Sequence, residues 1–285
     1  MMVITPADEY AARVAAFEDM RLRWRGGAGG DEWSPAIAEQ ARADPRRVAD
    51  ANLEALASYI DPDDTVVDVG GGAGRIGLAL ASRCREVINV DPSAAMRAQF
   101  ERTAAESGIT NARFVESVWP APDISGDVVL TTHVTYFVRD IVPFVRALEA
   151  AARRRVLIGL WSVPPPHMGA NVYQLVFGGP FEAPPGHREL LAVLWDMGIL
   201  PDVRVLPLPM RQNYTWLAEP TRDGMLERAL RAVQLHGSVD AQQAREQLDE
   251  HFDELFVVDK RGYHVRWPEG VREMLITWTT GSAGQ

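Results

Sequence analysis

The sequence is poor in cysteine and in lysine. Cys84 is the single cysteine among 285 residues, so this chain cannot form an internal disulfide bond or a metal cluster of thiolates. Lys260 is the only lysine, and arginine therefore supplies almost all of the positive charge. We interpret this bias, together with the many alanines, as the composition of a GC-rich genome rather than as a sign of function.

Long apolar runs and an excess of basic residues are also missing. No segment approaches the roughly 20 apolar residues that span a bilayer, and the first residues carry acids where a signal peptide needs bases. We therefore expect a cytoplasmic protein that does not bind membranes. The formal net charge of -10 argues against tight non-specific binding of nucleic acid. We expect no nucleic-acid partner, and a monomer or a homodimer.

Strand-like and helix-like segments alternate from residue 61 onward. Short apolar segments have the length of strands, and helical segments separate most of them. The alternation predicts an α/β fold: a doubly wound, mostly parallel seven-stranded sheet with helices on both faces and an antiparallel last strand. The expected strands are residues 65–70, 86–91, 112–117, 127–132, 154–162, 202–210 and 270–280.

The rest of the chain divides into further predicted parts. Residues 1–60 are expected to form an N-terminal helical segment or flap, and residues 61–285 the main domain. Within the main domain, residues 213–268 are interpreted as a helical insertion before the last strand. Residues 163–186 are rich in proline, glycine and aromatics, and we expect an ordered loop or lid there with little regular structure.

The stretch VVDVGGGAGR, residues 66–75, carries the strongest functional signal. Gly70 permits a sharp turn after the first strand, Gly72 lets the backbone approach a ligand, and Gly74 opens a helix. The amides at that helix start favour a negative or polar group. Asp91 ends the second strand, where a carboxylate can accept hydrogen bonds from both hydroxyls of a ribose.

Three ligands compete for this loop. A P-loop needs a lysine and a serine or threonine after its last glycine, but an arginine and an isoleucine follow here. A dinucleotide is a stronger candidate than a nucleoside triphosphate, since Gly72, Gly74 and Gly77 satisfy G-x-G-x-x-G. Asp68 favours the third ligand, S-adenosylmethionine, because a carboxylate beside the loop repels a pyrophosphate and suits the ammonium group of a methionine.

With these residues the chain resembles the class I S-adenosylmethionine-dependent methyltransferases, in particular those of small molecules. DVGGGAG matches the family's first motif, VINVDPS resembles the second, and DVVLTTHVTYFV resembles the segment at the fourth strand. The resemblance covers roughly residues 50–162. It implies S-adenosyl-L-methionine as cofactor, S-adenosyl-L-homocysteine as product, and no metal.

The resemblance also implies a set of cofactor-binding residues. The loop would hold the methionine part, Asp91 the ribose, and Pro92 or Ser93 the adenine. The family often has an acidic or small polar residue after the third strand to contact the adenine, but Val118 and Trp119 stand there. The implied residues are Asp68, Gly70, Gly71, Gly72, Gly74, Asp91, Pro92, Ser93, Val118, Trp119 and His133.

His133 is the candidate catalytic residue because it follows the fourth strand, at the edge where open α/β sheets bind ligands. It could act as a general base for a hydroxyl or an amine, or it could simply hydrogen-bond the cofactor or a loop carbonyl. The remaining histidines are scattered, so we expect no metal site. The candidate substrate-pocket residues, for which ordinary packing is the alternative, are Trp33, Tyr136, Phe137, Trp161 and Tyr173.

The predicted function is transfer of a methyl group from S-adenosylmethionine to an O, N, S or C atom of a small-molecule acceptor. No [DNS]-P-P-[YFW] tetrapeptide follows the fourth strand, and no cysteine lies near it to serve as the nucleophile of a pyrimidine C5 enzyme. The alternatives are a catalytically inactive S-adenosylmethionine-binding module and an NAD(P)-dependent oxidoreductase.

Overall fold

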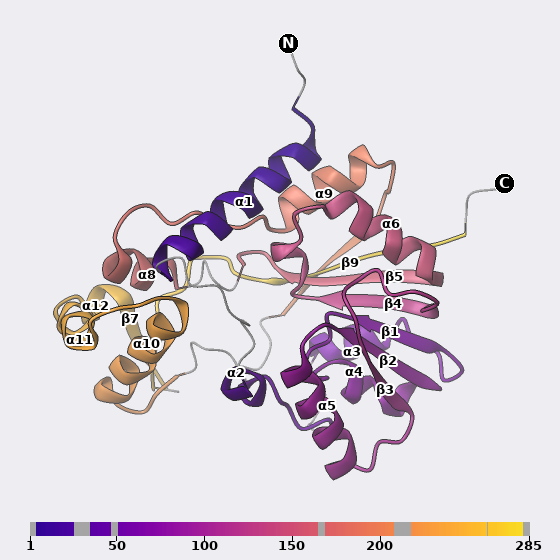
Figure 1. Cartoon of the computed structure of the whole chain (residues 1–285), viewed down its shortest axis with the longest axis horizontal. Coiled ribbons are helices and arrows are strands. Elements are labelled where there is room, and N and C mark those ends of the chain that lie inside the picture. The colour runs from indigo at the N-terminus through magenta and orange to yellow at the C-terminus, as the bar shows by residue number, and fades with distance from the viewer. Residues whose placement is uncertain are drawn as a thin grey trace.

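A computed structural model describes residues 4–25, 35–46, 51–164, 169–207, 218–260 and 262–281. Within these residues, seven strands form one sheet in the order β3-β2-β1-β4-β5-β9-β6 (Figure 1). Strands β1 to β5 pair in parallel, and β9 is antiparallel to both of its neighbours. The predicted fold class is confirmed. The bounds are β1 (Thr65–Val69), β2 (Glu86–Asp91), β3 (Ala112–Glu116), β4 (Gly126–Thr132), β5 (Ala152–Trp161), β6 (Asp202–Leu206) and β9 (Glu273–Thr279).

The central strands are apolar on both faces because helices cover both sides of the sheet. Figure 1 shows α1, α6 and α9 on one side and α3, α4 and α5 on the other. Several polar residues are buried in this core, and two of them face each other. Asp68 in β1 and Asn89 in β2 lie opposite each other in the register, and both are completely buried. The helix bounds are α1 (Pro6–Trp24), α3 (Ala51–Ala57), α4 (Gly77–Leu80), α5 (Ala94–Glu106), α6 (Ile141–Ala151) and α9 (His187–Asp196).

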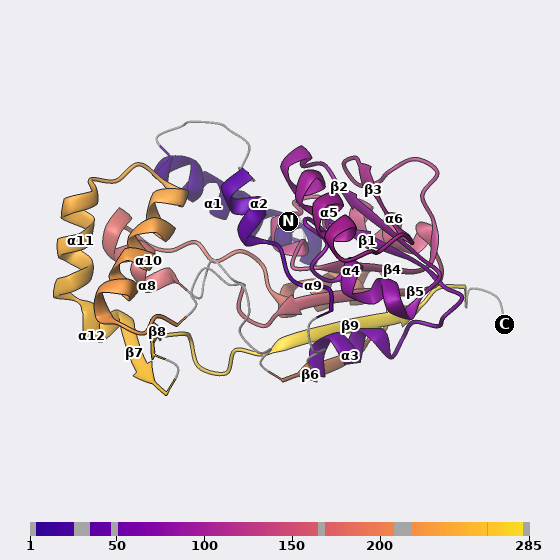
Figure 2. The same ribbon diagram turned by 90° about the horizontal axis from the view of Figure 1, so that it is seen from below.

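A group of helices beside the sheet forms what we call the helical lobe (Figure 2). Its first helix, α8, packs against α10 and α11. The lobe stands at the carboxyl ends of the parallel strands. The chain enters it after β5, leaves it for α9 and β6, and enters it again before it returns at the start of β9. It comprises α8 (Ala170–Phe177), α10 (Arg222–His236), α11 (Ala241–Glu250), α12 (Phe252–Leu255), β7 (Phe256–Asp259) and β8 (Gly262–Val265).

The lobe corrects two expectations. Residues 163–186 contain the helix α8, and not only loop structure as we expected; Gly178, with φ of 72°, ends it. The insertion before the last strand is helical, as predicted, but it also contains the antiparallel pair β7–β8. In addition, the helix expected to open at Gly74 is only the single turn α4 followed by the 3₁₀ turn η1 (Ala81–Arg83).

Helix α1 is fixed on the domain by one apolar face. Tyr10, Val14, Phe17 and Met20 recur at helical spacing and are all buried. The Tyr10 hydroxyl donates a hydrogen bond of 2.6 Å to the carbonyl of Thr135, in the 3₁₀ turn η2 (Thr135–Phe137) that follows β4. The adjoining α2 (Pro35–Gln40) contacts α5. Whether residues 1–60 act as a separate flap stays a prediction.

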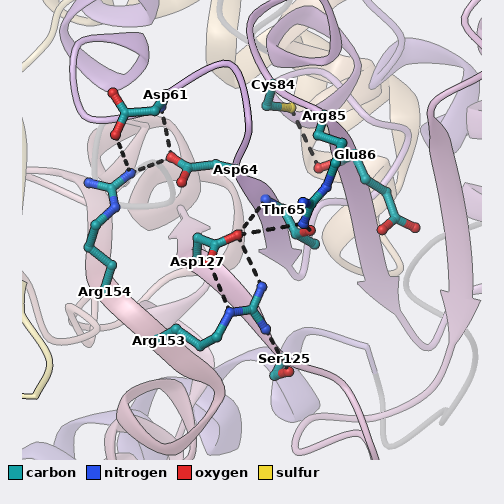
Figure 3. A network of polar contacts seen from close by, with 10 residues as sticks. All are labelled: Asp61, Asp64, Thr65, Cys84, Arg85, Glu86, Ser125, Asp127, Arg153 and Arg154. Carbon is teal, nitrogen blue, oxygen red and sulfur yellow. Dashed lines mark hydrogen bonds and ion pairs between the residues drawn. The ribbon is translucent and has the colours of Figure 1, made fainter.

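An arginine–carboxylate network lies at the amino ends of the strands, at the opposite end of the sheet from the helical lobe (Figure 3). Asp127 at the start of β4 accepts a hydrogen bond from the Thr65 amide at 2.8 Å and two from the Arg153 guanidinium at 2.8 and 3.0 Å. Arg154 pairs with Asp61 and Asp64 beside it. These contacts join β1, β4 and β5 at their amino ends. Among the described helices, none is long and apolar enough to cross a bilayer.

Candidate functional site

The glycine-rich loop leaves the sheet between β1 and α4. Gly70, Gly72 and Gly74 have φ of 69°, 52° and 82°, a left-handed conformation that favours glycine. The Gly70 amide donates to the carbonyl of Val90 at 2.7 Å, which holds the loop against the end of β2. The loop therefore has the fixed shape expected of a backbone that approaches a ligand closely.

Asp91 ties this loop to the next one. Its Oδ2 accepts a hydrogen bond from the Gly72 amide at 3.1 Å, and its Oδ1 accepts one from the Ser93 amide at 2.9 Å. Ser93 caps α5, since its hydroxyl accepts from the Met96 amide at 3.2 Å. Asp91 is half-buried. The ribose contact of Asp91 stays a prediction, but the residue also has a structural role that the sequence did not reveal.

Asp68 lies beneath the loop rather than on its surface. Its Oδ2 accepts a hydrogen bond from the Gly77 amide at 3.0 Å, whereas its Oδ1 has no hydrogen-bond partner among the described residues. Asn89 donates from Nδ2 to the Gly72 carbonyl at 3.2 Å. A Cβ at Gly71 would collide with the side chains of Asp68 and Asn89, so only glycine fits there. Burial raises the pKa of Asp68 to about 7.

The residues expected near the adenine lie at the adjoining ends of β2 and β3. Pro92 is exposed beside Asp91, and Val118 is 70% exposed. Trp119 is partly buried against the core. The Ser117 amide donates to the Asp91 carbonyl at 3.3 Å, so the two strand ends meet at one edge. The adenine contacts of these residues stay predictions.

His133 holds the strained position at the end of β4. Its φ of 62° is in the left-handed region, which is unusual for a residue other than glycine. Its Nε2 lies 3.3 Å from Oε1 of Glu273, the first residue of β9. Glu273 also accepts a hydrogen bond from Asn52 of α3. The His133 side chain is 14% exposed, so it is nearly enclosed at the carboxyl edge of the sheet.

The remaining substrate-pocket candidates divide by burial. Tyr136, Trp161 and Tyr173 are at most 2% exposed and belong to the main hydrophobic core, which favours the packing alternative for them. Phe137 is 38% exposed. Trp33 lies outside the described residues. The assignment of these residues to a substrate pocket stays a prediction.

A cavity of about 500 Å³ lies between the last turn of α1, the end of α8 and α11. Trp24 and Phe177 line it, and their rings stack at 4.6 Å between centroids. Tyr173 contacts both of these rings from the core. The cavity therefore borders the helical lobe at its junction with α1.

Four residues of this site did not emerge from the sequence: Asn52, Arg75, Asn89 and Glu273. A polar residue within an apolar segment could have indicated three of them, namely Asn89 in EVINVD, Asn52 in ANLEALA and Glu273 in EMLITW. The charge of Arg75 acts on Asp68, His133 and Glu273 together, which no sequence pattern indicates. Within the described part of the chain, no three His, Cys, Asp or Glu residues are placed to hold a metal ion.

Comparison with known proteins identifies the domain that carries this site. Residues 67–157 match the model of a family described as a methyltransferase domain. The YcgJ protein from Bacillus subtilis has the same fold, with a TM-score of 0.53 at 18% identity over 81% of this chain and 98% of that one. Part of this chain is therefore similar to a methyltransferase domain, on a fold that it shares with YcgJ. The glycine-rich loop and both buried polar residues, Asp68 and Asn89, lie inside the matched region of that domain.

Two further similarities extend the comparison of the methyltransferase domain. An S-adenosylmethionine-dependent methyltransferase from Thiobacillus denitrificans, in complex with S-adenosyl-L-homocysteine, has a TM-score of 0.50 at 15% identity over 85% of this chain and 95% of that one. The 23S rRNA (uracil(1939)-C(5))-methyltransferase RlmD of Aeromonas salmonicida is 43% identical over 67 residues. That segment is 24% of this chain and 14% of the relative, so this chain spans about a seventh of the relative's length.

Proposed function

We propose that this protein transfers the methyl group of S-adenosylmethionine to a small-molecule acceptor. The loop at Gly70–Gly74 carries the proposal, because its left-handed glycines open a backbone cradle directly above a buried acid. Asp68 would favour the ammonium group of the methionine, directly or through water, and Asp91 would hold the ribose. The bound cofactor would supply an electrophilic methyl group, and the protein would align the acceptor and exclude water.

An RNA acceptor is the alternative that the relatives raise. Transfer to uracil C5 needs a cysteine nucleophile beside the methyl donor. The only cysteine of this chain, Cys84, is 8% exposed and lies among the amino ends of the strands with the Asp127 network (Figure 3). Burial raises the pKa of its thiol to about 11, so it is protonated at neutral pH. Uracil C5 chemistry is therefore disfavoured for this chain.

Ligand binding tests the identity of the methyl donor. We expect S-adenosylhomocysteine to raise the melting temperature, and NAD and NADH to leave it unchanged, because a ligand that binds only the folded state stabilises it by about 2.7 kcal/mol at a hundredfold excess over Kd. Asp91→Asn keeps one acceptor oxygen but turns the other into a donor, which faces the backbone amide of Gly72 or Ser93 and cannot accept from a ribose hydroxyl. We expect it to weaken binding about 10- to 100-fold, since each lost hydrogen bond to a charged group is worth about 1.5–3 kcal/mol.

Glu101→Gln is the matched control. Glu101 is an exposed carboxylate on α5 that pairs with Arg97 of the same helix, so its loss removes the same charge without touching the loop. Calorimetry should give equal affinities for this variant and the unmodified protein. A melting temperature that responds to NAD and not to S-adenosylhomocysteine would make the protein an oxidoreductase instead. If the cofactor binds but no S-adenosylhomocysteine forms from S-adenosylmethionine with any small-molecule or RNA acceptor, the protein would be the inactive binding module.

A further inference from the structure

Three residues that are far apart in the sequence meet at the carboxyl edge of the sheet. His133 follows β4, Glu273 begins β9, and Asn52 lies in α3. Glu273 bridges the other two, with Oε1 toward Nε2 of His133 and Oε2 toward the Asn52 amide. Its side chain is 10% exposed, and a carboxylate so enclosed is tolerated only when its oxygens are bonded in this way.

The contacts of Glu273 assign the tautomer of His133. An ionised carboxylate only accepts hydrogen bonds, so Nε2 of a neutral His133 carries the proton and Nδ1 carries the lone pair. Burial acts to raise the pKa of Glu273, but the hydrogen bonds from His133 and Asn52 and the charge of Arg75 outweigh it, so the pKa is lowered and the group is ionised. The carboxylate therefore orients the ring as well as holding it.

The lone pair at Nδ1 faces the hydroxyl of Tyr136, which can donate to it. The hydroxyl of Tyr136 lies 3.4 Å from Nδ1, longer than an ordinary hydrogen bond from a hydroxyl. The same hydroxyl oxygen accepts a hydrogen bond from the Trp161 amide. Burial and the charge of Arg75 lower the pKa of His133, while Glu273 acts to raise it, and the net result is a lowered pKa. His133 is thus a neutral base at pH 7, with a strained backbone that fixes it at this edge.

We propose that Glu273 is a positioning residue that makes His133 the general base of the methyl transfer, and that the methyl acceptor is therefore a hydroxyl or an amine. This inference rests on the proposed function. As the acceptor oxygen or nitrogen bonds to the methyl carbon, the carbon–sulfur bond breaks and its electrons return to sulfur. The acceptor's proton passes to Nδ1 of His133, and Glu273 stabilises the imidazolium that results.

The test combines nuclear magnetic resonance with turnover, using protein saturated with S-adenosylhomocysteine for the first part. Nitrogen shifts of isotope-labelled histidine should show His133 as the neutral Nε2–H tautomer at pH 7, assigned by its loss in His133→Asn. Asparagine tolerates the left-handed backbone, so this variant should keep the fold. Glu273→Gln should lower the pKa of His133, since the imidazolium loses its counter-charge. A structural role alone would not move that pKa.

Turnover is measured as S-adenosylhomocysteine release from S-adenosylmethionine with a phenol, an alkylamine and a carboxylic acid. We expect turnover of the phenol or the amine, a loss of about 100-fold or more in His133→Asn, and a loss of about 10- to 100-fold in Glu273→Gln. The acidic limb of the pH profile should also move to lower pH in Glu273→Gln. Glu254→Gln is the matched control, because the exposed Glu254 faces a partly buried histidine, His251, at the same 3.3 Å.

Three results would overturn the inference: an Nδ1–H tautomer, a pKa of His133 that is the same in Glu273→Gln, or turnover of the carboxylic acid alone with no effect of either variant. None of these results affects binding of S-adenosylhomocysteine. If that ligand does not bind the unmodified protein, the proposed function itself fails, whatever tautomer His133 adopts. A failure of the roles proposed for His133 and Glu273 can therefore be distinguished from a failure of the proposed function.

Discussion

At the residue scale, Asp68 combines a role in the site with a cost to the fold. Its folded-state pKa of about 7 lies well above the unfolded value of about 3.9. Well below pH 4 the carboxyl is protonated in both states, so its ionisation does not affect stability there. As the pH rises toward 7, the unfolded chain ionises while the folded one resists, so stability falls. The buried acid therefore makes the protein less stable at neutral pH than a neutral residue would.

Asp68→Asn should consequently stabilise the protein, and more so at higher pH. The amide keeps an oxygen for the Gly77 amide and stays neutral at every pH. We expect the free energy of unfolding in urea to exceed that of the unmodified protein by about 2–4 kcal/mol more at pH 8 than at pH 4. S-adenosylmethionine affinity should fall if the carboxylate serves the ammonium group. An equal difference at both pH values would show that Asp68 is not protonated in the fold.

At the element scale, the strength of the local pattern decided what could be predicted. All seven sheet strands were predicted from their apolar runs and from the turns between them. Helix α8 was missed because its eight residues are too few to show a helical period clearly, and they lie among glycines and prolines. The hairpin β7–β8 has strands of four residues, too short for a period of two to be seen. Long-range pairs such as His133 with Glu273 leave no local pattern at all.

The docking of α1 gives a prediction for a whole element. Burial raises the pKa of Tyr10 above its ordinary value, so its hydroxyl is always available to donate to the Thr135 carbonyl. Tyr10→Phe removes this bond while the ring remains packed. We expect a loss of about 1 kcal/mol in the free energy of unfolding and faster hydrogen exchange confined to α1 and η2.

Tyr59→Phe provides the comparison, because its hydroxyl forms no hydrogen bond with the described residues although its ring packs against Arg155. Exchange in α1 should be unchanged in that variant. If Tyr10→Phe left the exchange of α1 as slow as before, the apolar face alone would fix the helix, and the hydroxyl would have no measurable part in it.

At the scale of the whole molecule, the carboxyl ends of the strands carry the proposed binding site, and the amino ends carry contacts that stabilise the fold. The glycine loop, Asp91 and His133 lie at the carboxyl ends of the strands, and the Asp127 network lies at the amino ends (Figure 3). The glycine-rich motif indicated the site at the carboxyl ends from the sequence alone. The sequence did not reveal the network at the amino ends, because Asp127, Arg153 and Thr65 belong to three different strands that only the fold brings together. We therefore expect changes there to alter stability and not ligand binding.

Asp127→Asn tests this separation. The hydrogen bonds from Arg153 hold the pKa of Asp127 at about 2, with the Thr65 amide and the charge of Arg85 adding to the effect. Because the folded-state pKa is below the unfolded one, the ionised carboxylate stabilises the fold at all pH values above about 4. At pH 7 the variant should lose about 1–2 kcal/mol in the free energy of unfolding, which allows for the partial exposure of this group.

The pH dependence distinguishes this effect from a loss of packing. The contribution of Asp127 to stability should decline between pH 4 and pH 2, so the two proteins should converge in stability as the acid is protonated. Urea unfolding at a series of pH values measures the difference, and calorimetry with S-adenosylhomocysteine measures binding on the same samples. A difference that persists unchanged at pH 2 would assign the loss to packing. Weaker ligand binding in Asp127→Asn at pH 7 would mean that the amino ends of the strands are coupled to the site, contrary to the division of the sheet argued above.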